Sequence, residues 1–183
     1  MFAILKTTTL AFALMATSAL AMENPMVGGA AMLDTKNIIE NAVNSADHTT
    51  LVAAVKAAGL VDALQGAGPF TVFAPVNDAF AALPAGTVET LLKPENKDTL
   101  VKILTAHVVA GSFTTAQMAA KAKASKDGYF NMTTLSGDHL SAQVKGKNLY
   151  IYDEMGKTAK VTISDVVQSN GIIQVVDAVL LPK

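Results

Sequence analysis

The sequence changes character near Asp127, and this change limits the folds that are open to the chain. Before this residue, apolar side chains recur at helical spacing, as in TKNIIENAVNSA and HTTLVAAVKAAG. After it, β-branched runs such as KVTISDVV and GIIQVVDAVLL are separated by turn pairs of the Asn-Gly and Gly-Asp type. Helices gathered in the first half and antiparallel strands in the second predict an α+β fold in one domain, not a doubly wound α/β fold.

The first residues of the chain have the pattern of an export signal. A lysine precedes the apolar run at 10–20, and ALA at 19–21 supplies the small residues of a cleavage site. The run is shorter than the roughly 20 residues that span a bilayer, so a membrane anchor is the less favoured alternative. We predict a secretory signal peptide at 1–21, a flexible leader at 22–34 and a folded domain at 35–183. After signal removal we expect no membrane span and a periplasmic or extracellular location.

Three residue types that carry much of protein chemistry are missing. The chain has no cysteine and no tryptophan, and all 14 of its basic residues are lysine. Without cysteine there is no disulfide, thiol nucleophile or cysteine metal site. Without arginine, and with a formal net charge of -1, nucleic acid is not an expected partner. The aromatic content of 5% also disfavours a deep sugar-binding cleft.

The stretch GPFTVFAPVNDAF at 68–80 looks like the strand-to-helix corners on which many folds place catalytic groups. Residues 70–74 are a nearly continuous apolar run, which predicts a central strand covered on both faces. Asn77 stands where a helix N-cap belongs, and Asp78 follows in the first helical turn. No serine elbow, phosphate-binding or dinucleotide-binding pattern accompanies the corner, so we interpret it as a structural joint.

The three histidines are the remaining candidates for catalysis or metal binding. His48 falls in the first turn of a helix and is expected to be exposed, whereas His139 lies at a turn. His107 lies on the apolar face at the end of a helix, where we expect a packed residue bonded to a backbone carbonyl. No second histidine stands at ligand spacing. We therefore predict no catalytic residue, no metal and no cofactor, and a hydrolase built on a serine with His107 or His139 is the weakest alternative.

Two stretches carry a family resemblance, GPFTVFAPVNDAF and the closing SNGIIQVVDAVLLP, with LLKPENKDTLVKILTAHVVAG between them. In order and spacing they resemble the two homology blocks of the fasciclin domain, over residues 36–182. The chain is most similar to the single-domain secreted bacterial members. The resemblance implies a wedge of two small β-sheets with helices packed around one side. It also implies an adhesion or matrix-associated module, not an enzyme.

The resemblance also points to residues that could contact a partner. The stretch NKDTL at 96–100 is similar to a short integrin-recognition stretch of animal fasciclin proteins. The family often has a Tyr-His pair linked to receptor binding in animal members, and here Ala106 replaces the tyrosine before His107. Gln174 stands where the family often has histidine. The candidate interaction residues are Asn96, Lys97, Asp98 and His107.

These observations predict a secreted, non-enzymatic adhesion or surface-interaction module. Its expected partner is a cell-surface or matrix protein or a glycan, contacted by exposed loops and helix ends on a rigid scaffold. The alternative is a periplasmic small-ligand or lipid-binding protein, because 51% hydrophobic residues with few aromatics are compatible with an apolar cleft between helices and sheet. Neither interpretation specifies an oligomeric state.

Overall fold

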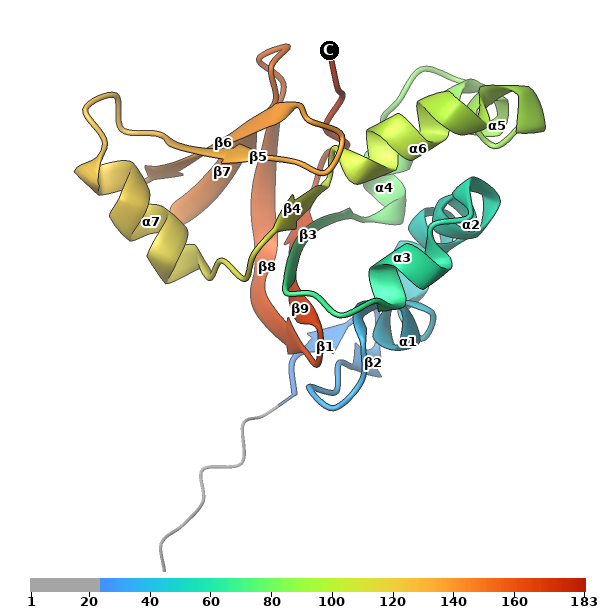
Figure 1. Cartoon of the computed structure of the whole chain (residues 1–183), viewed down its shortest axis with the longest axis horizontal. Helices are drawn as coiled ribbons and strands as arrows, with labels where there is room; N and C mark the ends of the chain where they lie inside the picture. The colour runs from blue at the N-terminus through green and yellow to red at the C-terminus, as the bar shows by residue number, and fades with distance from the viewer. Residues whose placement is uncertain (1–23) are drawn as a thin grey trace, which may run out of the picture.

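The computed structural model describes residues 24–183, and the export signal predicted at 1–21 lies outside them. Helices dominate the first half of the described chain and strands the second half, which confirms the α+β class (Figure 1). In chain order the elements are β1 (Met26–Val27), β2 (Ala30–Ala31), α1 (Ile38–Ala42), the 3-10 turn η1 (Ala46–His48), α2 (Thr49–Ala58), α3 (Val61–Gln65), β3 (Phe70–Pro75), α4 (Asn77–Ala81), α5 (Thr87–Leu91), the 3-10 turn η2 (Pro94–Asn96), α6 (Lys97–Thr105), β4 (Val108–Ala110), α7 (Thr115–Ala124), β5 (Phe130–Thr133), β6 (His139–Lys145), β7 (Asn148–Tyr152), β8 (Thr158–Gln168) and β9 (Gly171–Val176).

The strand β3 lies inside the main sheet, as its apolar run predicts. It pairs antiparallel with β4 and parallel with β9, with Phe70 opposite Gly171. The strand order is β4-β3-β9-β8-β7-β6-β5. The long strand β8 links the two parts of this sheet, because it pairs with β9 and, near its start, with β7. A β-bridge between Val109 of β4 and Thr134, just after β5, connects the two end strands of the sheet. The sheet therefore folds back on itself into the expected wedge of two small sheets.

The β3–β9 pair separates two hydrophobic cores. One face of the pair, with Val72 and Val175, packs against the helices of the first half, and we call this the helix-side core. The other face, with Phe73 and Val176, packs against the inner face of β6–β8 in the strand-side core. Because both faces are covered, β3 is buried along nearly all of its length.

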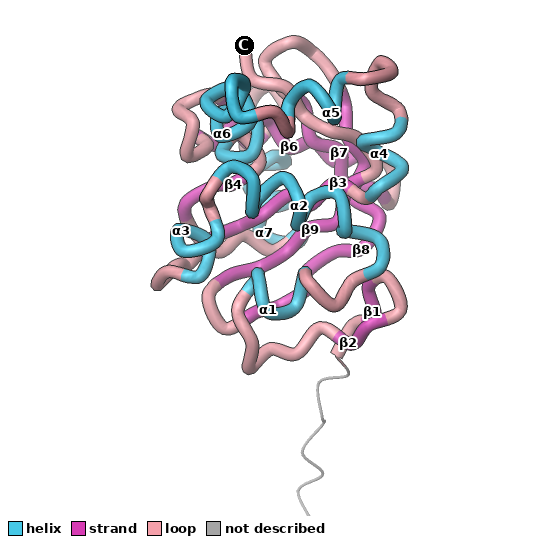
Figure 2. The backbone as a smooth tube through the Cα atoms, turned by 90° about the vertical axis from the view of Figure 1, so that its right-hand side faces the viewer, coloured by secondary structure: helices cyan, strands magenta, loops and turns pink. Residues whose placement is uncertain are grey.

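The helices α1 to α6 lie on one side of the sheet, whereas α7 lies apart from them (Figures 1 and 2). The helices α2 and α6 contribute Leu51, Val55 and Ile103 to the helix-side core. The helix α7 packs instead on the strand-side core through Met118 and Ala122. A large aliphatic side chain buried in this way contributes about 1.5–3 kcal/mol, so the apolar faces of the helices hold them on the sheet.

A polar network attaches the start of α7 to β8. Asp165 adopts the left-handed conformation, with a φ of 57°, beside the register irregularity of β8. Its carboxylate accepts hydrogen bonds from the Thr115 N–H (2.7 Å), from the Thr115 hydroxyl and from Gln174 Nε2 (2.8 Å). Gln174 is fully buried, and its Oε1 accepts from the Asp165 N–H at 3.0 Å. The amide of glutamine donates and accepts at once, which suits it to this position.

Residues 26–31 form a small antiparallel hairpin of β1 and β2, which differs from the flexible leader expected at 22–34. Val27 and Met32 are buried in the helix-side core. Gly28, with a φ of 57°, lies so close to Ser45 that an added Cβ would be 2.4 Å from the Ser45 hydroxyl oxygen. Two-residue strands leave no periodicity in the sequence, and the contact with Ser45 is tertiary, so the sequence pattern did not reveal this hairpin.

Asn77 does not cap α4 as expected, because it is the first residue of that helix and Val76 occupies the cap. Its side chain reaches back to the 3-10 turn η1 and the first turn of α2 instead. The Asn77 Oδ1 accepts from the Thr50 N–H at 3.0 Å, and its Nδ2 donates to the Ala46 carbonyl at 2.8 Å. The corner at 68–80 thus ties β3 and α4 to the start of α2, in agreement with its interpretation as a structural joint.

Gly171→Ala is expected to destabilise the domain by roughly 1–3 kcal/mol, the usual cost of overpacking. A Cβ at this position would lie 2.2 Å from the carbonyl oxygen of Phe70, inside the β3–β9 pair. Urea unfolding followed by circular dichroism measures the change. The control is Ser169→Ala, at an exposed position in the same turn, which should change stability by less than about 0.5 kcal/mol. Equal stability of the two variants would contradict the importance of this close backbone approach.

Candidate functional site

The outer face of β5–β7 collects aromatic and polar side chains. Side chains alternate along β7, so Leu149 and Ile151 point into the strand-side core whereas Tyr150 and Tyr152 point outward. Tyr129, just before β5, lies on the same side against Tyr152. All three tyrosines of the chain are therefore on one surface. We call this surface the tyrosine face and define it by Tyr129, Gln143, Lys145, Tyr150 and Tyr152.

Short contacts order the tyrosine face. The rings of Tyr129 and Tyr152 meet edge to face, with their centroids 5.6 Å apart. The Tyr152 hydroxyl donates a hydrogen bond to Gln143 Oε1 at 3.3 Å. The ammonium nitrogen of Lys145 lies 5.3 Å from the Tyr152 ring centroid and 6.0 Å from that of Tyr150, within cation–π range. Half-buried rings held in this way lose less side-chain entropy when a partner binds.

Lys145 gives this surface a positive charge. Its side chain is exposed, and the Tyr152 hydroxyl beside it raises the pKa of its ammonium group. Tyrosine rings are enriched in protein interfaces because each offers a large rigid area with a polar tip. Flat rings bordered by hydrogen-bonding groups also suit the apolar faces of sugar rings. The tyrosine face is thus able to contact a protein or a glycan.

Sequence reasoning missed the tyrosine face and treated the low aromatic content as evidence against sugar binding. One signal was present, because the alternation in NLYIY at 148–152 places two tyrosines on the same side of a strand. The positions of Lys145 and Tyr129 beside them depend on the pairing of β7 with β6 and of β6 with β5. That register is set by tertiary packing, so sequence spacing alone does not show it.

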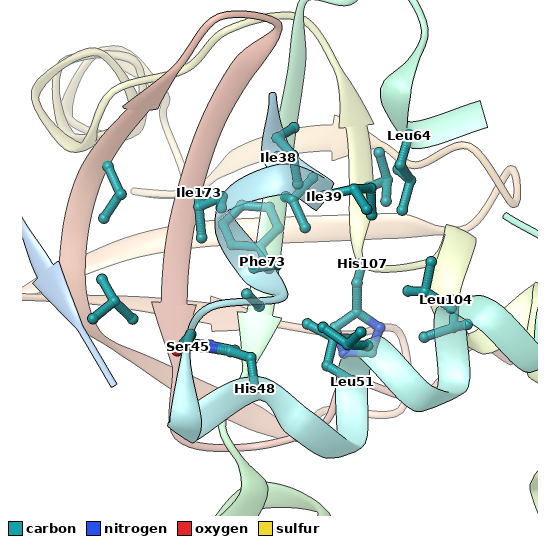
Figure 3. Close-up of a pocket in the computed structure, with 18 of the residues that line it drawn as sticks. Ile38, Ile39, Ser45, His48, Leu51, Leu64, Phe73, Leu104, His107 and Ile173 are labelled. Carbon is teal, nitrogen blue, oxygen red and sulfur yellow. Dashed lines mark hydrogen bonds between the residues drawn. The ribbon is translucent and has the colours of Figure 1, made fainter. Parts of the chain in front are cut away.

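A second candidate site is an apolar pocket between the helices and the sheet (Figure 3). The helices α1, α2 and α3 form one wall, and the strands β3, β4, β8 and β9 with the β1–β2 hairpin form the other. Leu104 of α6 also lines the pocket. The cavity volume is about 50 Å³, enough for a few water molecules or a small apolar group. The polar side chains in its lining are Ser45, His48, Lys56 and His107.

The expectation of an exposed His48 is wrong, because only 3% of the residue is exposed. It ends the 3-10 turn Ala46–His48 and lines the pocket at the start of α2. Its Nδ1 lies 2.9 Å from Ser45 Oγ, and its Nε2 has no hydrogen-bond partner of normal geometry within residues 24–183. Burial lowers the pKa of the imidazole, while the Ala74 carbonyl and the Asp47 carboxylate act in the opposite direction. The ring is therefore a neutral group with one unused nitrogen.

His107 is a packed residue bonded to a backbone carbonyl, which confirms the expectation for this position. Its Nδ1 lies 2.8 Å from the Ile103 carbonyl oxygen, and its Nε2 accepts from the Leu180 N–H at 2.9 Å. These two bonds require a neutral ring with the proton on Nδ1. Burial lowers the pKa of His107 to about 4, although the Ile103 carbonyl opposes this change. At 3% exposed, the ring joins α6 to the C-terminal segment and has almost no surface for a partner.

The other candidate interaction residues lie at the start of α6, at the opposite end of that helix from His107. Lys97 and Asp98 are exposed. Asn96 is half-buried, and its Nδ2 donates to the Thr90 carbonyl at 2.7 Å, so it holds the turn that leads into the helix. The structure does not bring these residues together with His107, and their contact with a partner stays a prediction.

The hydrolase alternative gains no support from the geometry of its two histidines. His139 Nδ1 lies 3.3 Å from Thr133 Oγ1, and both nitrogens of His107 bond to backbone atoms, so neither ring has a serine partner in the described chain. Within residues 24–183, no cluster of three or more histidine, aspartate or glutamate side chains is placed to hold a metal ion. None of the helices in this part is both long and apolar enough to cross a membrane.

The low pKa of His107 predicts acid sensitivity. His107 takes up a proton near pH 6.5 in the unfolded chain but only near pH 4 in the folded chain. The contribution of this group to the free energy of unfolding is therefore greatest above pH 6.5 and is lost as the pH falls toward 4. Between pH 7 and pH 5 the free energy of unfolding should fall by about 2 kcal/mol from this group. Urea unfolding at both pH values measures it. In His107→Gln the fall should be clearly smaller, and an unchanged fall in that variant would contradict this assignment.

Known proteins that resemble this chain in sequence belong to the same family as proteins that resemble it in fold. Residues 46–182 match the model of the Fasciclin domain. Protein sll1483 of Synechocystis sp. is 50% identical over 160 residues, which cover 87% of this chain and 81% of that protein. Immunogenic protein MPB70 of Mycobacterium bovis is 34% identical over 146 residues, which cover 77% of this chain and 66% of that protein.

A solved structure shares the architecture. It is the FAS1 domain pair from the insect cell adhesion molecule fasciclin I, which matches with a TM-score of 0.71. The sequence identity is 20%, and the match covers 80% of this chain and 51% of that one, so it shows a common fold. Together with the family match over residues 46–182, these relatives show that the chain belongs to the fasciclin domain family.

Proposed function

We propose that the chain is an exported, non-enzymatic adhesion or surface-interaction module that binds a cell-surface or matrix protein or glycan through the tyrosine face. The observation that carries the proposal is the gathering of Tyr129, Tyr150 and Tyr152 around Lys145 on one outward sheet face. Family membership supports it, because a FAS1 domain pair belongs to an insect cell adhesion molecule. Export rests on the signal pattern at 1–21.

The tyrosine face has the physical properties of a contact surface. Its rings supply apolar area at low entropic cost, and their hydroxyls supply hydrogen bonds at the rim. Next to them, the Ser141 hydroxyl donates to Asn131 Oδ1 at 2.6 Å and extends the polar border on β5 and β6. Lys145 adds a charge that selects for an acidic or electron-rich partner.

The strands beneath this surface form a rigid support. The opposite side of β6 and β7 carries Leu140, Ala142 and Ile151, which are almost fully buried in the strand-side core. A substitution on the tyrosine face therefore changes the surface and leaves the packed interior in place. This separation makes the surface suitable for mutational tests. The exposed Lys97 and Asp98 at the start of α6 form a second, competing surface.

The double variant Tyr150→Ala/Tyr152→Ala is expected to weaken binding by about thirtyfold or more, because central interface tyrosines often contribute 2 kcal/mol or more. Labelled protein comprising residues 22–183 is bound to intact producing cells and to their extracted matrix, and unlabelled protein competes for the site. Circular dichroism and urea unfolding check that the variant is folded.

The matched control is Lys97→Ala/Asp98→Ala, a double substitution on the competing surface. It should bind within about threefold of the unsubstituted protein, since exposed positions outside an interface change little. Loss of binding in the control but not in the tyrosine variant would move the contact to the start of α6. Absence of saturable binding to both cells and matrix would contradict the adhesion proposal itself.

A further inference from the structure

The pocket between the helices and the sheet contains one buried polar atom whose hydrogen-bonding capacity is unused, His48 Nε2. Ser45 Oγ is engaged by His48 Nδ1, and both nitrogens of His107 are engaged by backbone atoms. Lys56 is exposed at the rim. Apart from these groups the lining is apolar (Figure 3).

A buried polar atom without a partner is unfavourable, and folded proteins rarely contain one without a water or ligand to satisfy it. A buried water needs about two to four polar partners. Around His48 Nε2 the neighbouring polar side chains already have partners, and the Ala74 carbonyl that acts on the ring makes no hydrogen bond of normal geometry with Nε2. A water there would therefore have few polar partners and would face apolar walls on its other sides. A molecule with a single polar group on an apolar body matches this pocket better than water does.

The chemistry of the imidazole limits the kinds of polar group that the ligand can carry. Burial keeps the pKa of His48 below its ordinary value, so the ring is neutral at pH 7. With Nδ1 bonded to the Ser45 hydroxyl, Nε2 is a donor or an acceptor according to the direction of that bond. A hydroxyl group fits either case, because it has one hydrogen to donate and two lone pairs to accept. A charged group beside His48 would lose its hydration in these apolar surroundings, because the charged residue of the lining, Lys56, is exposed at the rim.

We infer that this pocket binds an uncharged apolar molecule that carries one hydroxyl group. The hydroxyl bonds to His48 Nε2, and the apolar body lies among the side chains of α1, α2 and α3 and against Phe73 and Ile173 of the β3–β9 pair. The site is separate from the tyrosine face, which lies on the outer side of β5–β7. Its test is therefore independent of the proposed adhesion.

The rim of the pocket gives the ligand access. Ala42, Val52 and Val61 are half-buried there, beside the exposed Lys56. The helices α1 and α3 have five residues each, and such short helices are held by packing more than by their own hydrogen bonds. The cavity of about 50 Å³ takes the hydroxyl end, whereas an engineered cavity that binds benzene has about 150 Å³. A ligand with a ring therefore requires the rim to move outward.

Phenol and toluene provide a direct test, because they have nearly the same shape and differ in a hydroxyl against a methyl group. Each is titrated into nitrogen-15-labelled protein comprising residues 22–183, and amide chemical shifts are followed. Phenol should give saturable shifts in α1, α2 and α3 and bind about threefold to tenfold more tightly than toluene, the gain from one neutral hydrogen bond.

His48→Leu should abolish the preference for phenol. It also removes the partner of the buried Ser45 hydroxyl, which costs about 1–3 kcal/mol, so circular dichroism checks that the variant is folded. The same substitution at an exposed histidine, His139→Leu, is the matched control and should keep the preference. Equal affinity of phenol and toluene for the unsubstituted protein, or shifts only outside the pocket, would overturn the inference. That comparison requires no variant, so it decides the matter even if His48→Leu fails to fold.

Discussion

The parallel pairing of β3 with β9 is the contact on which the rest of the structure depends. It brings Phe70 opposite Gly171 from distant parts of the sequence, and its two faces become the floors of the two cores. The flanking elements are attached to this pair by hydrogen bonds. Asn170, in the turn before β9, accepts from the Ile38 N–H of α1 at 3.0 Å and donates to the Leu64 carbonyl of α3 at 2.8 Å. His107 connects the end of α6 to the segment after β9 in the same way.

Two cores of different construction give the domain two different kinds of surface. The strand-side core takes every second residue of β6 and β7, so the intervening residues must face outward, and the tyrosine face is their consequence. The helix-side core is assembled from short helices around a sheet, and their packing leaves the pocket that holds His48. The surface proposed to contact a large partner and the pocket proposed to bind a small apolar molecule therefore belong to opposite halves of the sheet.

Much of the fold could be predicted from the sequence, but the sites could not. Helical and alternating periods identified the α+β class, and the continuous apolar run at 70–74 identified the central strand. The position of His107 on an apolar helix face predicted its packing. The burial of His48 depends on the 3-10 turn before α2, and the role of Asn77 depends on a contact with Ala46 and Thr50. The tyrosine face depends on strand register. Each of these is a tertiary arrangement that local spacing does not specify.

The central claim is that the protein acts by surface contact through the tyrosine face. Hydrogen–deuterium exchange of residues 22–183, free and bound to extracted matrix, tests it most directly because it maps the contact without any substitution. The account predicts slower exchange in the bound state at residues 129–152, which carry Tyr129, Lys145, Tyr150 and Tyr152. Protection confined to the start of α6, around Lys97, or no protection anywhere on the bound protein, would contradict it.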